Sequence, residues 1–308
     1  DSNIELIDGS EILSQVFSGE DSAIIILTAG VDIALENSQV RALVINSGPA
    51  FVMFNAENNI SLTADSRVSA NAFEGISNIT FRALNISLED SVVRANSFGS
   101  FLARVYFDAA NDIEIISSTV AANDLWPDDG GLARIRFDAG NDILLDEESE
   151  VKANAVDGSS WISFNAVNNV QLTDSLIWAF SKFAPSEIGG AYIDFTTEAG
   201  DIILNHSEVR AIDPPVENGN AQVSFSSAND ILITNDSLVK ARNYFDGAST
   251  VNLSALHDII VADSAVIARV DGPGIATLNL EAGNSINISQ AEEPGTIRAY
   301  VAGNGDAT

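Results

Sequence analysis

The chain has no cysteine among its 308 residues, and only 14 Lys and Arg stand against 44 Asp and Glu. The missing cysteine excludes a disulfide framework, a thiol nucleophile and a thiolate metal site. A formal net charge of −30 disfavours nucleic acid and anionic membranes as partners and favours cations. The longest aliphatic run, at 23–27, is far too short to span a bilayer, so no membrane insertion is expected.

One pattern recurs along the whole sequence, and "DAGNDILLDEESEVKAN" at 138–154 is an example of it. Aligned on the aliphatic residue that follows a short polar one, as in Asp142-Ile143, the chain divides into eleven units with steps of 26–32 residues. Each unit has an aromatic residue or Leu before this anchor, a Ser after it, and then an aliphatic residue and Ala. Because the fixed positions lie two apart within three short segments, each unit is predicted to hold three strands.

A unit of this length cannot cover its own apolar side chains, so the units must stack and share one core. The sequence therefore predicts an all-β fold, a single right-handed parallel β-helix over 1–308 with about eleven coils of three short strands. With strands about 4.8 Å apart, the rod would be roughly 50 Å long. The aromatic column is predicted to form a stack inside the coil, from Phe54, Phe81, Phe107, Phe137, Phe164, Phe195 and Phe225.

The corners between the strands have their own residue types. The Asn or Asp before each anchor, together with clusters of Gly, Asn, Asp and Pro, is expected to supply left-handed and turn conformations. The recurring Ser is expected to mark a turn in which its hydroxyl binds backbone nearby.

The repeat resembles that of a known family. The resemblance is carried by Ala139-Gly140-Asn141-Asp142-Ile143, by Ala199-Gly200-Asp201-Ile202 and by Ala282-Gly283-Asn284, with the trailing Ser-x-aliphatic-x-Ala. These residues resemble the repeats of filamentous haemagglutinin-like exoproteins, the large secreted adhesins, and more broadly the parallel β-helix proteins of bacterial and archaeal cell surfaces. The resemblance covers essentially the whole chain and implies a secreted protein. The units here are longer and more acidic, so a surface-layer, sheath or filament protein fits as well as an adhesin shaft.

Two groups of oxygen-bearing residues are candidate cation ligands. The acidic loops 123–131, 181–190 and 212–220 should project from one corner of the rod, where Asp124, Asp128 and Asp129 could hold a metal ion. The recurring Asn-Asp pairs place further oxygens in register and leave Ca²⁺ open as a ligand, although the Gly-Gly-x-Gly-x-Asp repeat of calcium-binding β-rolls is missing. No other cofactor is expected. His206 and His257 stand in different columns, without the spacing of a metal site or catalytic triad, and are interpreted as solvated turn residues.

Two sets of surface residues bear on partners. Seven Asn-x-Ser/Thr sequons are candidate glycosylation sites of an exported chain, at Asn59, Asn78, Asn85, Asn205, Asn235, Asn252 and Asn287. Six of the fourteen basic residues fall in one outward-facing row, namely Arg41, Arg94, Lys152, Arg210, Lys240 and Arg298. This row could bind the acidic face of a neighbouring rod, or it could merely offset stacked carboxylates of its own molecule.

The first unit begins at its second strand and neither end shows a recognisable cap. Such ends suit either a piece of a longer solenoid or subunits that add to one another head to tail by β-augmentation. The sequence therefore predicts an extracellular structural protein, not an enzyme, that assembles with itself into a filament, sheath or layer. The alternatives are the shaft of a secreted adhesin and a β-helix that binds or cleaves polysaccharide, with cell-surface glycans as its partner.

Overall fold

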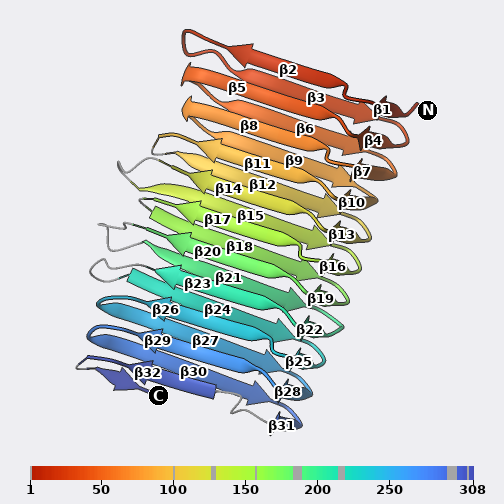
Figure 1. Ribbon diagram of the computed structural model, residues 1–308. Coiled ribbons are helices and arrows are strands. Elements are labelled where there is room, and N and C mark those ends of the chain that lie inside the picture. The colour runs from red at the N-terminus through yellow and green to blue at the C-terminus, as the bar shows by residue number, and fades with distance from the viewer. Residues whose placement is uncertain are drawn as a thin grey trace.

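The computed structural model describes residues 2–99, 101–125, 130–156, 158–182, 189–213, 219–289, 297–303 and 305–308. The described chain winds into a solenoid of three parallel sheets with eleven strands each, and every coil contributes one strand to each sheet (Figure 1). The all-β, three-stranded coil predicted from the repeat is confirmed. The closing residues 306–307 add a strand to one sheet beyond the eleven units counted in the sequence.

The strands of each sheet follow one another at intervals of three along the chain. Sheet A contains β1 (Ile4–Leu6), β4 (Ile33–Glu36), β7 (Asn59–Thr63), β10 (Asn85–Glu89), β13 (Ile113–Ile116), β16 (Ile143–Asp146), β19 (Val170–Thr173), β22 (Ile202–Asn205), β25 (Ile231–Thr234), β28 (Asp258–Ala262) and β31 (Ser285–Ser289). Sheet B contains β2 (Glu11–Val16), β5 (Gln39–Ser47), β8 (Arg67–Glu74), β11 (Val92–Ser97), β14 (Thr119–Asp124), β17 (Glu150–Ala155), β20 (Leu176–Ser181), β23 (Glu208–Asp213), β26 (Leu238–Asn243), β29 (Ala265–Val270) and β32 (Ile297–Val301). Sheet C contains β3 (Ala23–Ala29), β6 (Ala50–Ala56), β9 (Ser77–Ala83), β12 (Leu102–Ala109), β15 (Gly131–Ala139), β18 (Gly158–Ala166), β21 (Gly190–Thr197), β24 (Gly219–Ser227), β27 (Gly247–Ala255), β30 (Gly274–Ala282) and β33 (Asp306–Ala307).

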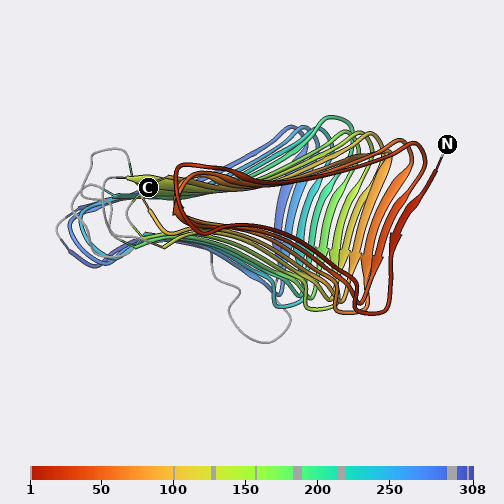
Figure 2. The same cartoon turned by 90° about the horizontal axis from the view of Figure 1, so that it is seen from above.

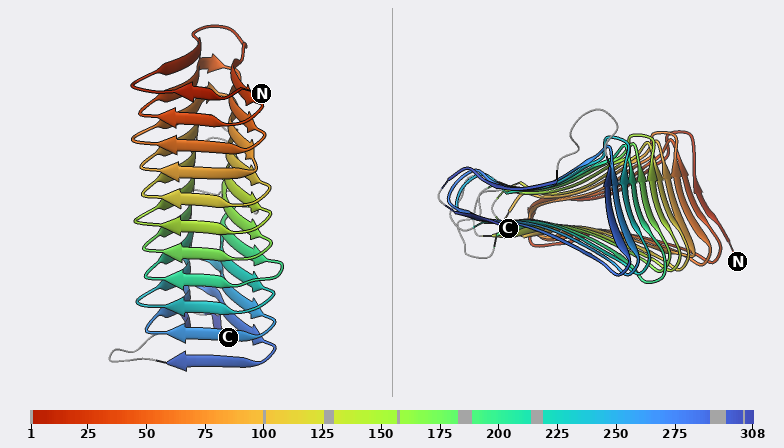
Figure 3. Two further views of the ribbon diagram at one scale, coloured as in Figure 1. Left: turned by 90° about the vertical axis from the view of Figure 1, so that its right-hand side faces the viewer. Right: turned by 90° about the horizontal axis from the view of Figure 1, so that it is seen from below.

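The cross-section is a narrow triangle. Figure 2 shows sheet A as its short base, with sheets B and C as two longer sides that converge away from it. Figure 3 shows the strands of sheet A following one another along the whole length of the rod. Inward side chains alternate with outward ones on every side, which is the period-2 burial that the sequence pattern anticipated.

Equivalent residues of successive coils lie directly beside one another. In sheet C, Phe107 pairs with Phe137, and Phe137 with Phe164. Ring centroids are 4.7–4.9 Å apart from Phe54 to Phe195 with nearly parallel planes, and Phe225 meets Phe195 edge-on at 4.7 Å. Counted from the anchor, Phe81 and Phe195 are displaced by one residue, yet both pair in register. The corner between sheets C and A therefore absorbs the difference in length.

We predict that Phe137→Ala lowers the free energy of unfolding by ~3–5 kcal/mol, because the ring is fully buried between two others and its removal leaves a cavity. The measurement is the midpoint of urea unfolding followed by circular dichroism. Phe17→Ala is the control, since 65% of that side chain is exposed, and its midpoint should stay close to that of the parent chain. Equal losses from both substitutions would contradict a stack that stabilises the coil.

The corner from sheet A to sheet B uses a left-handed residue followed by the recurring Ser. Asn37, Asp90 and Asp174 have φ of 46–48° and directly precede Ser38, Ser91 and Ser175. Among the described residues, all the non-glycine positions with positive φ lie in this corner. The expectation that the Asn or Asp before the anchor adopts this conformation was therefore wrong, because the left-handed residues lie after the sheet A strand and not before it.

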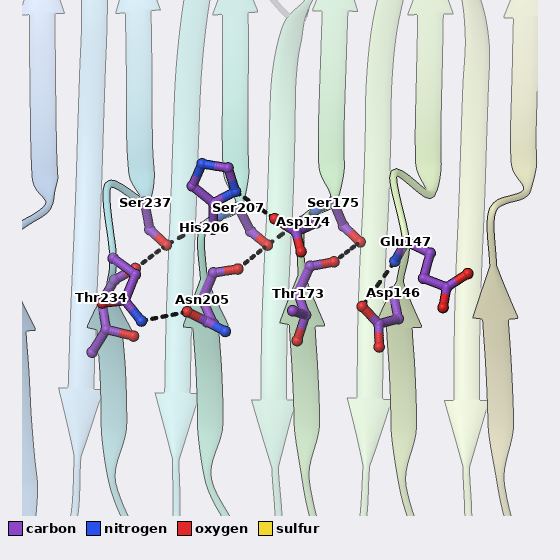
Figure 4. Close-up of polar contacts among 11 residues, drawn as sticks. Asp146, Glu147, Thr173, Asp174, Ser175, Asn205, His206, Ser207, Thr234 and Ser237 are labelled. Carbon is purple, nitrogen blue, oxygen red and sulfur yellow. Dashed lines mark hydrogen bonds and ion pairs between the residues drawn. The ribbon is translucent and has the colours of Figure 1, made fainter.

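The Ser column makes two kinds of hydrogen bond in this corner. The Ser175 hydroxyl donates to the carbonyl of Thr173 at 2.7 Å, the local bond expected from the sequence (Figure 4). In addition, the backbone N–H of Ser175 donates to Oγ of Ser207, one coil further, at 3.1 Å. The buried hydroxyls thus satisfy backbone groups that the turn leaves without a strand partner.

The corner from sheet B to sheet C brings buried polar side chains against glycines. Asp213, at the end of β23, is fully buried, and a Cβ on Gly219 would lie 1.6 Å from its Oδ2. A Cβ at this position would force the Asp213 carboxyl group to move, so Gly219 leaves the space that this group occupies. Burial raises the pKa of the Asp213 carboxyl to about 8, against the opposing effect of a hydrogen bond with Ser181.

We predict that Asp213 makes stability fall as pH rises. The unfolded carboxyl ionises near pH 4, whereas the folded one keeps its proton to about pH 8, so the folded state binds more protons across this window. Asp213→Asn should remove this part of the decline in the urea midpoint between pH 4 and pH 8. Asp90→Asn, an exposed substitution that Asn tolerates at φ 47°, is the control for loss of one charge. Parallel profiles for the parent chain and Asp213→Asn would contradict the assignment.

Candidate functional site

The basic row predicted from the sequence lies on the outward face of sheet B. Strand pairing aligns its members in one column, with Ser69, Ala121, Trp178 and Ile267 in the intervening coils. Arg67, Arg242 and Arg269 lie in the outward columns on either side of this one. The predicted row did not include them because each is two residues away from the row's position in its strand. Sheet B thus carries nine of the fourteen basic residues: Arg41, Arg67, Arg94, Lys152, Arg210, Lys240, Arg242, Arg269 and Arg298.

The side formed by sheet A has the opposite character. No Lys or Arg occurs in the segments that form sheet A and the corners on either side of it, whereas acidic residues occur in nearly every coil there. Charge is therefore segregated between faces of the rod. A molecule of net charge −30 carries one face on which cationic side chains predominate.

In the C-terminal half of the sheet B face, several basic side chains form ion pairs with nearby carboxylates of the same chain. Lys152 forms an ion pair with Glu150, and Arg210 with Glu208, each within one strand. Arg242 and Arg269 share the single carboxylate of Asp271. Burial acts to raise the pKa of that carboxyl, but hydrogen bonds from the two guanidinium groups hold it below its ordinary value. Two cations on one carboxylate leave a local excess of positive charge.

Coils two to four of sheet B form an arginine groove. We give this name to a shallow depression of about 410 Å³ in which Arg41, Arg67 and Arg94 meet, from β5, β8 and β11. No carboxylate occurs among the described residues that line it. Asn71 and Asn96 close one side and bind each other, with Nδ2 of Asn96 donating to Oδ1 of Asn71 at 2.6 Å. Three guanidinium groups beside amide side chains suit an oxyanion ligand.

An acidic groove lies further along the rod, where the corner from sheet A meets sheet B. This depression of about 730 Å³ is lined by five carboxylates and one imidazole, those of Glu147, Glu148, Glu150, Asp174, Glu208 and His206. The left-handed conformations of the corner project several of these side chains outward. In Figure 4 the imidazole of His206 points to the carboxylate of Asp174 in the preceding coil.

His206 is an exposed turn residue, and it also has an anionic partner that the sequence did not reveal. The hydrogen bond between its Nδ1 and Asp174 raises the pKa of the imidazole, and the carboxylate's charge acts in the same direction. The two residues are 32 positions apart, so only the stacking of coils brings them together. His257 makes a comparable contact at 2.5 Å with the amide oxygen of Asn229.

We predict that the His206 imidazole titrates above pH 6.5 and that Asp174→Asn lowers its pKa towards the ordinary value. The measurement is the pH dependence of the His206 ring resonances by NMR, compared between the parent chain and Asp174→Asn. A His206 pKa that does not respond to Asp174→Asn would contradict the contact.

The Asn and Asp side chains considered for Ca²⁺ form a ladder between coils. Oδ1 of Asp142 accepts a hydrogen bond from the backbone N–H of Asn169 at 2.8 Å and from its Nδ2 at 3.0 Å. Oδ1 of Asp201 likewise accepts from the N–H of Asp230 at 3.0 Å. These oxygens thus bind amide donors of the next coil. No group of three or more acidic or histidine side chains suited to a metal ion occurs in the described part of the chain.

The loop candidates lie mostly outside the described residues. Asp128 and Asp129 are among residues 126–129, and the centres of the other two acidic loops, 183–188 and 214–218, are likewise outside the described residues. Asp124 is described: it is fully buried at the end of β14, and a Cβ on Gly131 would lie 1.8 Å from its Oδ2. Its carboxylate therefore faces the interior of the coil instead of the surface of the loop.

The sequon asparagines differ in accessibility. Asn59, Asn235 and Asn287 are exposed, whereas Asn78 is buried. Nε of Arg104 donates to Oδ1 of Asn78 at 2.9 Å. Asn78 would have to leave this contact to carry a glycan, so glycosylation stays a prediction that suits the three exposed positions best.

The class of this protein rests on its fold alone. No family model matches the chain, and neither a curated protein nor a solved structure matches it. The resemblance to haemagglutinin-like repeats therefore rests on the repeat residues, while the structure supports the coarser class, a parallel β-solenoid. None of the described residues form a helix long and apolar enough to cross a membrane.

Proposed function

We propose that this chain is an extracellular structural protein, a rod that serves as a building block of a surface filament, sheath or layer. The observation that supports this role is the continuous strand pairing: all eleven strands of each sheet pair with their neighbours along the described chain, with one register shift near the end of β5. The recurring positions of the repeat hold core residues and side chains that contact the next coil. Phe107, Ser175 and Asp142 are examples. A rod built in this way resists bending because every coil is bonded to the next on three sides.

The outermost coils support assembly along the rod axis. β1, β2 and β3 pair with a neighbouring strand on one side, as do β31, β32 and β33 at the other end. Ile286 and Ile288 of β31 point inward in register with Ile259 and Val261, yet they are 44% and 47% exposed, against 0% and 1% for the residues of the coil above. A further coil would bury them, and we propose that the first coil of another copy supplies it by β-augmentation.

The test is electron microscopy of the purified chain over a range of protein concentrations. We expect filaments of constant width that are several times longer than the roughly 50 Å of one rod. The double substitution Ile286→Lys/Ile288→Lys should abolish them, because it places charges on the apolar end of the core. Asn287→Lys is the matched control in the same strand, since that side chain already faces outward. Rods of single-chain length under all conditions would refute end-to-end assembly.

A further inference from the structure

We propose that two copies of this chain also associate side by side through the outward face of sheet B, with the arginine groove of each copy against the acidic groove of the other. This lateral contact deepens the structural role proposed above and rests on it. Its test is independent of assembly at the ends.

The two grooves are complementary in charge. The arginine groove presents Arg41, Arg67 and Arg94, and none of these has an ion pair with a described carboxylate. In the acidic groove, Glu150 and Glu208 are paired with Lys152 and Arg210 of their own strands. Glu147 and Glu148 have no cationic partner among the described residues, and Asp174 contacts His206 through Oδ1 alone, so these three carboxylates are the ones that can meet the guanidinium groups of a partner. Arginine and carboxylate form the strongest charge-assisted hydrogen bonds among side chains.

The positions of the grooves along the rod make the surface self-complementary. The arginines belong to β5, β8 and β11, and the acidic groove spans the coils of β17, β20 and β23. β14 is the strand midway between the two sets in sheet B. A two-fold axis passing over β14 therefore exchanges the grooves, so both contacts form at once in one closed, isologous dimer.

The centre of this face is shaped for close approach. The outward residues of β14 are Thr119, Ala121 and Asn123, and none of them carries a long side chain. Ala121 occupies the column that holds Arg94 and Lys152 in the adjacent coils. The acidic groove lies nearer than the arginine groove to the edge of sheet B that adjoins sheet A. The two rods must therefore cross at an angle for the grooves to meet.

A second copy fits this face better than a polyanionic glycan. A glycan would find three arginines in one groove and would be repelled by five carboxylates in the other. A second copy satisfies both grooves, and its charges repeat with the same spacing of about 4.8 Å per coil.

The experiment is sedimentation velocity in the Ile286→Lys/Ile288→Lys background, which blocks end-to-end growth. We expect a dimer at low salt whose dissociation constant rises at least about tenfold in 0.5 M NaCl. The triple variants Arg41→Glu/Arg67→Glu/Arg94→Glu and Glu147→Lys/Glu148→Lys/Asp174→Lys should each be monomeric, because like charges then face each other. An equimolar mixture of the two should restore the dimer, because every groove again meets its opposite.

Several outcomes would overturn the contact. These are a parent chain that stays monomeric at low salt, a dimer that survives either triple substitution, and a mixture that fails to associate while both variants keep the parent's circular dichroism spectrum. Binding of dextran sulfate by the monomeric parent chain, lost in the arginine variant and kept in the acidic one, would reassign the arginine groove to anionic glycans. Filament formation is measured separately, in the chain without the end substitutions. Failure of the lateral dimer can therefore be distinguished from failure of end-to-end assembly.

Discussion

The structure depends on one constraint: each residue must lie beside its own equivalent in the next coil, about 4.8 Å away. Side chains that tolerate or favour a copy of themselves fill the recurring columns. Phenylalanine stacks, serine passes a hydrogen bond from coil to coil, and Asp142 binds the amide groups of Asn169. A carboxylate beside a carboxylate is unfavourable. In sheet A, Glu114 has Ser87 and Leu144 as its neighbours. In sheet C, where Asp108 pairs with Asp138, each carboxylate forms an ion pair with an arginine.

The same constraint organises the charge. A rod with a net charge of −30 places most of its acidic residues on the outward columns and at exposed corners, where water screens them, whereas Asp124 and Asp213 are buried. Basic residues gather on sheet B, some paired within a strand and others grouped without a carboxylate. When the same residue type recurs at one outward position of successive coils, it forms a continuous strip along the rod. The charge of each face is therefore set by its columns of equivalent residues. The lateral contact proposed above rests on that organisation.

Much of the fold could be predicted because the repeat is redundant. Eleven approximate copies show which positions stay apolar, and a spacing of two identifies strands even where a single unit is ambiguous. The corners were harder. The residue with a left-handed backbone is the one directly before Ser175 and before the equivalent serines. The Asp before the anchor, such as Asp142, instead accepts a hydrogen bond from the backbone N–H of the next coil. Both positions carry Asn and Asp, so composition alone does not separate a residue that bends the chain from one that binds the next coil.

The number of strands per coil, the inward columns and the single row of basic residues could be predicted from the sequence, because they follow from periodicity within and between units. Which residues of different coils and columns meet became known only from the folded coils. Arg67 joins Arg41 and Arg94 across two columns, and His206 reaches Asp174 across 32 residues. The physical reason is that corner lengths and left-handed turns set the direction of each outward side chain. The order of residues in the sequence does not show that direction.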